Sequence, residues 1–447
     1  MIERRKRWLL CVGLAFFLTG CTVHPAGERE ERQAALHNGA AFTQPVEKRQ
    51  LPPLSPDPSP EDLVRYALAS NADIEQRYWE WRSAIEQIPQ DGTQATNLTI
   101  SAGTTISKGQ LSSDRTTLAA LNDPMADIVW PTKLSVASQR ALENARAAGL
   151  RFAQAKFDLR AKVLDAWYAY ALNAELIRIE QSNAELLATG VLVVEARNRA
   201  GAAGQQDLLK ASNELDLSRN DLANMQAQLP ALLSALNALL GRPPEVALAA
   251  PAALPTTRPI SESNGKLLAM AQRENPELKA MAAEIRGRGS SIELAKLQYV
   301  PDFSLSAGTD LAGLTQSLLG SVTVPFLRHE AIDAAIAQAE ANLHSTEAAR
   351  RQTQNDLGAR FVGDISALRD ADRQLALFDQ VILPRLARMV ELSRSAYESG
   401  QSSLLDLLDS QRSLLSVRRL VAELRVAREK RLADLESILA RPLDASD

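Results

Sequence analysis

Hydrophobic residues recur at helical spacing near both ends of the chain. The first stripe predicts a helix over residues 61–88 and consists of Leu63, Ala67, Leu68, Ile74 and Tyr78. A near-heptad stripe predicts another helix over residues 404–439; its members are Leu414, Val417, Val421, Leu424, Leu432, Leu435 and Leu439. Stripes of this kind are buried against other helices, so the pattern predicts paired coiled coils.

Two further stretches predict helices that are too long to cover a globular core. Residues 133–199 contain no proline, which predicts about 67 residues of helix, ~100 Å long at 1.5 Å per residue. The chain then turns at residues 201–204 and is expected to return as a helix over residues 205–240. Residues 330–398 predict a second long helix, which Pro384 should kink or interrupt.

Alternating sequences between these helices predict a small β part. We expect strands at residues 98–106, 125–130, 302–309 and 318–326, with a helix over residues 266–298 before the second pair. The predicted fold is therefore mainly α with a small β part, built from duplicated long helical hairpins plus four strands.

The chain repeats itself at an offset of 199 positions. Residues 201–243 align without a gap to residues 400–442, and Asp207 falls on Asp406. Solenoid repeats have periods of roughly 20 to 50 residues, so this offset indicates a duplicated module of domain size. We divide the chain into a signal peptide (1–20), a lipidated Pro-rich tether (21–60), a first repeat (61–243), a linker (244–264), a second repeat (265–442) and a tail (443–447).

The N-terminus has the pattern of a bacterial secretory signal. Four basic residues precede an apolar run from Trp8 to Leu18, which is too short for the ~20 residues of a membrane span. The sequence Leu18-Thr-Gly-Cys21 is similar to a lipobox, which implies cleavage before Cys21 and lipidation of its thiol. The alternative is an ordinary signal peptide, which would leave Cys21 as an unpaired thiol in an oxidising compartment. Thr22 favours the outer membrane, and the prolines that follow predict an extended tether.

Composition excludes several classes of protein. Charged residues make up 23% and aromatic residues 4% of the chain, as is typical of long helices, and the net charge of −4 gives no reason to expect nucleic acid. The histidines offer no close set of metal ligands; they are His24, His37, His329 and His344. Because there is also no Gly-rich phosphate loop and no Cys/His nucleophile pair, we expect no enzyme, no metal site and no cofactor.

The order of these features resembles the TolC-like outer-membrane efflux proteins, in their lipoprotein branch. The signature Ala396-Tyr-Glu-Ser-Gly400 leads into Leu404-Leu-Asp-Leu-Leu-Asp409, and the resemblance covers residues 61–442. It implies a homotrimer with a twelve-stranded β-barrel in the outer membrane and an α-helical tunnel in the periplasm. It also implies the passive exit duct of a tripartite efflux or type I secretion system. The implied partners are a periplasmic adaptor (membrane fusion protein), an inner-membrane pump and outer-membrane lipid.

The resemblance also assigns roles around the turns. Asp406 and Asp409 are implied to be pore gate and selectivity carboxylates, which in a trimer would attract cations and raise one another's pKa. The local alternative is that Ser403 caps its helix with Asp406 as the capping partner. Tyr397 and Asp207 are implied to latch the tip through a hydrogen bond. The residues implied to form the tip turns and to dock the adaptor are Gly201, Gly204, Gly400 and Ser402.

Two other functions compete with the exit duct. A periplasmic adaptor also carries a lipobox and a helical hairpin, but it has one central hairpin flanked by β-rich domains. A structural coiled-coil lipoprotein without a pore predicts neither the duplication nor the paired carboxylates. The sequence therefore favours the exit duct, and it names neither the cargo nor the pump.

Overall fold

We describe a computed structural model of the chain. The structure describes residues 22–93, 98–104, 116–122, 129–254, 256–260, 262–310 and 316–443. The predicted signal peptide and Cys21 lie outside these residues. The chain divides into two compact units, and neither corresponds to one sequence repeat. The first comprises residues up to Ala40, Arg77–Arg151 and Glu277–Thr353; the second comprises Ala41–Gln76, Phe152–Pro276 and the chain from Gln354 onward.

Helices make up most of the described chain, and both predicted long hairpins are confirmed. The helices are α2 (Glu28–Asn38), α3 (Pro60–Ser70), α4 (Ala72–Gly92), α5 (Pro131–Arg199), α6 (Gln205–Leu239), α7 (Asn264–Glu274), α8 (Pro276–Leu297), α9 (His329–Leu377), α10 (Leu383–Glu398) and α11 (Leu404–Leu439). A π-helical segment, Phe378–Ile382, separates α9 from α10 directly before Pro384, where the sequence predicts an interruption. No helix in the described ranges combines the length and the hydropathy of a membrane span.

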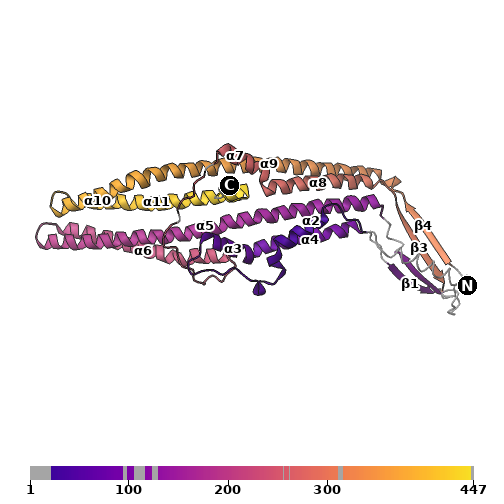
Figure 1. The fold of residues 1–447 in the computed structure, drawn as a ribbon, viewed down its shortest axis with the longest axis horizontal. Coiled ribbons are helices and arrows are strands. Elements are labelled where there is room, and N and C mark those ends of the chain that lie inside the picture. The colour runs from indigo at the N-terminus through magenta and orange to yellow at the C-terminus, as the bar shows by residue number, and fades with distance from the viewer. Residues whose placement is uncertain are drawn as a thin grey trace. The chain divides into compact units, whose positions relative to one another are not determined.

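One antiparallel sheet of four strands belongs to the first unit (Figure 1). Its strands are β1 (Leu98–Thr104), β2 (Thr116–Asn122), β3 (Asp302–Asp310) and β4 (Gln316–Thr323), in the order β1-β2-β3-β4. β2 and β3 are joined over a short register, with Thr117 opposite Asp310 and Leu118 opposite Thr309. Each repeat therefore contributes one hairpin to a shared sheet.

The second strand lies earlier in the chain than the sequence predicts. The predicted strand at residues 125–130 is wrong in its described part, because Val129 and Trp130 belong to no strand; residues 125–128 lie outside the described residues. The strand is instead β2, whose register with β1 places Leu98 opposite Asn122. Pairing with a neighbouring strand decides this element more than local alternation does. The other three predicted strands are confirmed, with ends shifted by a few residues.

The segment after Cys21 is not the extended tether that its prolines predict. It includes the helix α2, whose Ala35 is fully buried. Gly39, just after α2, lies so close to the ring of Tyr78 on α4 that a β-carbon at this position would overlap the ring. The prediction failed because a few specific contacts outweigh the polar composition of the segment.

Two asparagines end the first helix of each repeat in the same way. The helix predicted over residues 61–88 is broken at Asn71, and its counterpart in the second repeat is broken at Asn275. The side-chain amide of Asn71 donates to the carbonyl of Leu239 at 2.9 Å, and that of Asn275 donates to the carbonyl of Ile438 at 3.0 Å. Leu239 and Ile438 are related by the same offset of 199 positions as the turns. Each repeat therefore ties its entry helix to the end of its own returning helix.

Buried ion pairs hold the linker between the repeats against α11 in the second unit. Arg258 of the linker donates to Glu429 at 3.1 Å and to Glu436 at 3.0 Å. Glu429 is 2% exposed and Glu436 is 1% exposed, and Arg160 of α5 reaches the other oxygen of Glu436 at 3.2 Å. Charges this deeply buried require partners, so the network fixes the path of the linker.

Candidate tip site

The two long hairpins end in turns with the same backbone geometry. Gly201 follows α5 with φ of +75°, and Gly400 follows α10 with φ of +76°. In each turn the residue after the glycine donates its N–H to the carbonyl five residues earlier, at 2.8 Å. Glycine adopts positive φ without steric cost, so both turns require it.

Below the turns, an apolar cluster packs the two hairpins of the second unit against each other. Its buried members come from α5, α6, α10 and α11, the helices that run to the turns in Figure 1. They are Leu187, Val194, Ala211, Leu215, Tyr397, Leu404, Leu407 and Leu408. Because both hairpins contribute, separating the tips would expose this cluster to water.

A link that the sequence analysis missed joins the two turns. Arg197, in the last turn of α5, donates from Nη1 to the carbonyl of Tyr397 and, at 3.3 Å, to that of Glu398. The guanidinium carbon of Arg197 also lies 4.6 Å from the centre of the Tyr397 ring. A cation is favoured at the carbonyl end of a helix, here α10. The repeat gave one available signal, because Ala396 occupies the matching position in the second copy.

The predicted hydrogen bond between Tyr397 and Asp207 is not formed. The Tyr397 hydroxyl is buried and has no hydrogen-bond partner among the described residues. Burial raises the pKa of Tyr397, an effect that Arg197 opposes and Asp207 reinforces. The two residues nevertheless line the same cavity, so the structure brings them near each other without bonding them. Arg197 holds the tyrosine ring and the neighbouring carbonyls instead.

Asp406 makes the capping box that the local alternative predicts. Ser403 Oγ accepts a hydrogen bond from the N–H of Asp406 at 3.2 Å, and the Asp406 carboxylate accepts one from the N–H of Ser403 at 3.1 Å. These hydrogen bonds from Ser403 lower the pKa of Asp406. Asp409 has a side chain that is 61% exposed and lies 3.6 Å from Arg412. Both carboxylates are exposed on the first two turns of α11.

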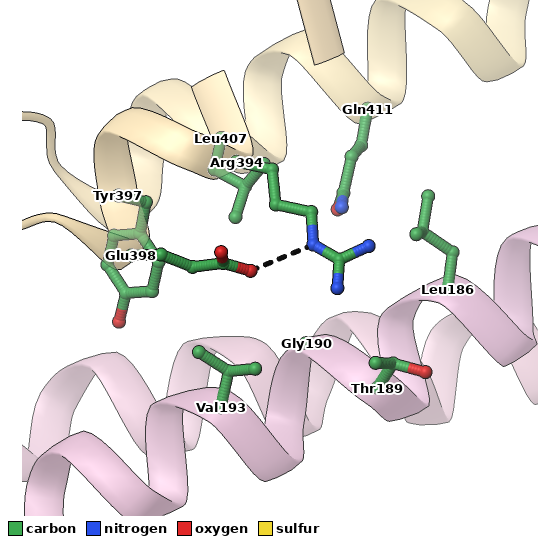
Figure 2. Close-up of a pocket in the computed structure, with 9 residues that line it drawn as sticks. All are labelled: Leu186, Thr189, Gly190, Val193, Arg394, Tyr397, Glu398, Leu407 and Gln411. Atoms are coloured by element: carbon green, nitrogen blue, oxygen red, sulfur yellow. Dashed lines mark hydrogen bonds and ion pairs between the residues drawn. The ribbon is translucent and has the colours of Figure 1, made fainter. Parts of the chain in front are cut away.

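A small pocket lies just below the turns, between α5 and the pair α10 and α11 (Figure 2). Leu186 and Val193 form part of its apolar wall, and the ion pair between Arg394 and Glu398, at 2.9 Å, lies across from them. Gly190 has no atom within 4 Å of the place where a β-carbon would be. The missing side chain therefore helps to keep the pocket open.

The polar groups at the tip form helix caps, a carbonyl clamp and ion pairs, and none forms a pair of nucleophile and base. The described residues include no group of three or more His, Cys, Asp or Glu side chains that could hold a metal ion. The fold and the tip together define a duplicated helical-hairpin protein whose functional end is a pair of linked turns.

Comparison with known sequences gives this class its family. The family model described as outer membrane efflux protein matches residues 267–441. The cobalt-zinc-cadmium resistance protein CzcC of Cupriavidus metallidurans is 25% identical over 328 residues, which span 68% of this chain and 72% of CzcC. The probable outer membrane lipoprotein SilC of Salmonella typhimurium is 23% identical over 393 residues, spanning 83% of this chain and 84% of SilC. The chain belongs to the outer membrane efflux protein family, whose members are channels and not enzymes.

Solved structures agree on the fold. The outer-membrane channel MtrE of Neisseria gonorrhoeae, in its open state, superposes with a TM-score of 0.72 at 18% identity, covering 87% of this chain and 90% of MtrE. The outer membrane protein VceC of Vibrio cholerae superposes with a TM-score of 0.73 at 18% identity, covering 86% of this chain and 96% of VceC. At these identities the likeness concerns the fold alone.

Proposed function

We propose that the chain is the passive exit duct of a tripartite efflux or type I secretion system. Three copies would each add a four-stranded sheet to a twelve-stranded β-barrel and two hairpins to an α-helical tunnel. One observation carries this proposal: Arg197 and the apolar cluster close the hairpins of one chain on each other, while Asp406 and Asp409 stay exposed beside the turn. Exposed carboxylates at the end of a tunnel are placed to select for cations.

We also propose that residues 61–243 are a diverged copy of the efflux domain matched at residues 267–441. The match itself covers the second repeat. Two features support a common origin for both copies: the turns at Gly201 and Gly400 share their geometry, and Asn71 and Asn275 make equivalent hydrogen bonds.

The lipid anchor is proposed to be Cys21, inserted in the outer membrane. The residues directly after it support this assignment, because Thr22 pairs with Thr93 and Val23 donates its N–H to the carbonyl of Gly92 at 2.9 Å. Thr93 precedes β1, which begins at Leu98, by only a few residues. A lipid on Cys21 would therefore enter the same membrane as the strands.

The partners in this proposal are a periplasmic adaptor, which would dock on the two turns, and an inner-membrane pump, which supplies the energy. The docking residues would be Gly201, Gly204, Gly400 and Ser402. In the closed tip, Arg197 would act as the latch beside Tyr397 and Asp207. The named relatives include a cobalt-zinc-cadmium resistance protein and a probable lipoprotein, and a duct that passes what its pump delivers needs little chemistry of its own to recognise cargo.

Single-channel conductance in a planar bilayer tests the proposal. The purified, lipidated wild-type protein should give a small, cation-selective conductance. The double variant Asp406→Asn/Asp409→Asn should keep a conductance but lose much of the selectivity, because both carboxylates become neutral. A folded trimer that never conducts would instead favour the structural lipoprotein. A monomer that binds a separate outer-membrane channel would favour the adaptor.

A further inference from the structure

The two returning helices begin with the same backbone but with different caps. Gly204 is the N-cap of α6 at φ −79° and ψ 158°, and Ser403 is the N-cap of α11 at φ −80° and ψ 160°. Ser403 accepts a hydrogen bond from the N–H of Asp406, whereas Gly204 has no side chain with which to do so. A β-carbon at Gly204 would have no neighbour closer than 4.0 Å, so a serine would fit there. The first turn of α6 is thus left without a cap for no steric reason.

This open turn borders a cavity of about 300 Å³ in the second unit, between the two turns. Arg197 and Lys210 line the cavity with positive charge, and Asp207 lines it with negative charge. The same cavity is lined by Ser403 and by Ala203, which flank the beginnings of α11 and α6. Helix N-termini favour negative charge, so two cations and two helix ends outweigh one carboxylate.

Unsatisfied polar atoms belong to the same cavity lining. The Tyr397 hydroxyl, Ser402 Oγ and Arg197 Nε are all buried and have no hydrogen-bond partner among the described residues. Tyr397 as a whole is 4% exposed. Figure 2 shows its hydroxyl turned away from Arg394 and Gln411 and toward α5. Buried donors without partners are unfavourable, and three of them around one cavity indicate a missing acceptor.

We propose that this cavity is a binding site for a single carboxylate group. One carboxylate oxygen accepts hydrogen bonds from the free N–H groups in the first turn of α6, and the other accepts them from the hydroxyls of Tyr397 and Ser402. Arg197 and Lys210 carry two positive charges and Asp207 carries one negative charge, so the lining suits a monoanion. The carboxylate is either a free organic anion or the side chain of an aspartate or glutamate on a docking protein. The second source rests on the proposed docking function.

Saturation-transfer NMR on the detergent-solubilised full-length protein tests the site, because this method detects weak ligands of large assemblies. Sodium acetate is titrated at constant ionic strength with sodium chloride. A blocked aspartate, N-acetyl-aspartate amide, is titrated in parallel with its neutral asparagine analogue as control. We expect saturable binding of a carboxylate probe to the wild-type protein and none of the asparagine analogue.

The variants follow from the repeat. Gly204→Ser gives α6 the cap that α11 already has and should weaken carboxylate binding at least tenfold. Gly265→Ser is the matched control, because Gly265 also has no atom near its missing β-carbon and lies on α7. Tyr397→Phe should weaken binding severalfold without changing the volume of the ring. Equal binding by Gly204→Ser and the wild type, or no saturable binding of either probe, overturns the proposal.

The two probes distinguish the source of the carboxylate. Tenfold tighter binding of the blocked aspartate indicates a protein side chain, and equal binding indicates a free anion. Conductance is recorded on the same preparation, so that the two proposals fail separately. A conducting protein that binds neither probe sinks the carboxylate site alone, and a protein that binds acetate but does not conduct sinks the duct alone.

Discussion

Arg197 and Tyr397 join the two hairpin tips of one chain by two different interactions. The guanidinium donates to the backbone carbonyl of Tyr397 and at the same time lies 4.6 Å from the centre of its ring. The two residues are 200 positions apart, yet each sits within one turn of its own hairpin turn. The closed arrangement of the tip therefore depends on one arginine that reaches from the first repeat to the second.

Removing this arginine should loosen the tip. In Arg197→Ala the charge-assisted hydrogen bonds to Tyr397 and Glu398 and the ring contact are lost, which should cost about 2 kcal/mol. We expect a larger single-channel conductance in a planar bilayer, or more frequent open events, than in the wild type. Thermal unfolding should show only a modest loss, because the apolar cluster below the turns is unchanged.

Arg199→Gln is the matched control for this prediction. Arg199 lies in the same last turn of α5, but its side chain is 75% exposed and pairs only with Glu195. It should conduct like the wild type. If both variants open the channel equally, the effect comes from net charge at the tip, and the specific role of Arg197 is refuted.

The capping box at Asp406 should give a pH-dependent contribution to stability. Hydrogen bonds from Ser403 lower the pKa of Asp406 below its ordinary value of 3.8. A carboxyl group with a lowered folded-state pKa adds stability that is fully present above the unfolded value and is lost as the pH falls through the folded value. The wild type should therefore unfold at a higher temperature than Asp406→Asn at pH 6, and the difference should shrink below about pH 3.8.

Ser403→Ala provides the check on this pH dependence. It removes the hydroxyl that accepts the Asp406 N–H and should abolish part of the same advantage. A difference between wild type and Asp406→Asn that stays constant from pH 6 to pH 3 would show that the charge of Asp406 does not contribute to the cap.

Asn275 should matter for stability although it is far from both turns. Asn275→Ala leaves the carbonyl of Ile438 without its donor inside the protein, which should lower the free energy of unfolding by about 1–3 kcal/mol. Denaturant unfolding compares this variant with Asn342→Ala, whose exposed side chain on α9 makes no hydrogen bond in the structure. Similar losses in both variants would contradict the role given to Asn275.

The buried network at the linker should be the most sensitive polar site that we describe. Glu436→Gln keeps the shape of the side chain but leaves Arg258 and Arg160 without the charge that they share. Breaking a buried pair from one side typically costs about 3–5 kcal/mol. Thermal unfolding of the full-length protein should show this loss, whereas Glu340→Gln, an exposed position on α9, should have little effect.

The sequence predicted the elements that depend on long repeated patterns. The hairpin of α5 and α6 and the position of Gly400 follow from proline-free runs and from the offset of 199 positions, signals that add up over dozens of residues. Single contacts gave no such signal. The helix α2 is held by a few neighbours, and Arg197 acts on a residue 200 positions away, so neither follows from local composition. The Tyr397–Asp207 bond failed for the same reason.

The π-helical segment Phe378–Ile382 has a consequence for how this channel tolerates insertions and deletions. A π turn accommodates one more residue than an α turn, and each residue rotates the following helix by about 100°. Deleting a single residue here would restore a regular helix and turn the whole of α10 about its axis. Tyr397, at the far end of α10, would then face away from Arg197 although no residue at the tip had changed. The phase of the gate is therefore set some fifteen residues before the gate itself.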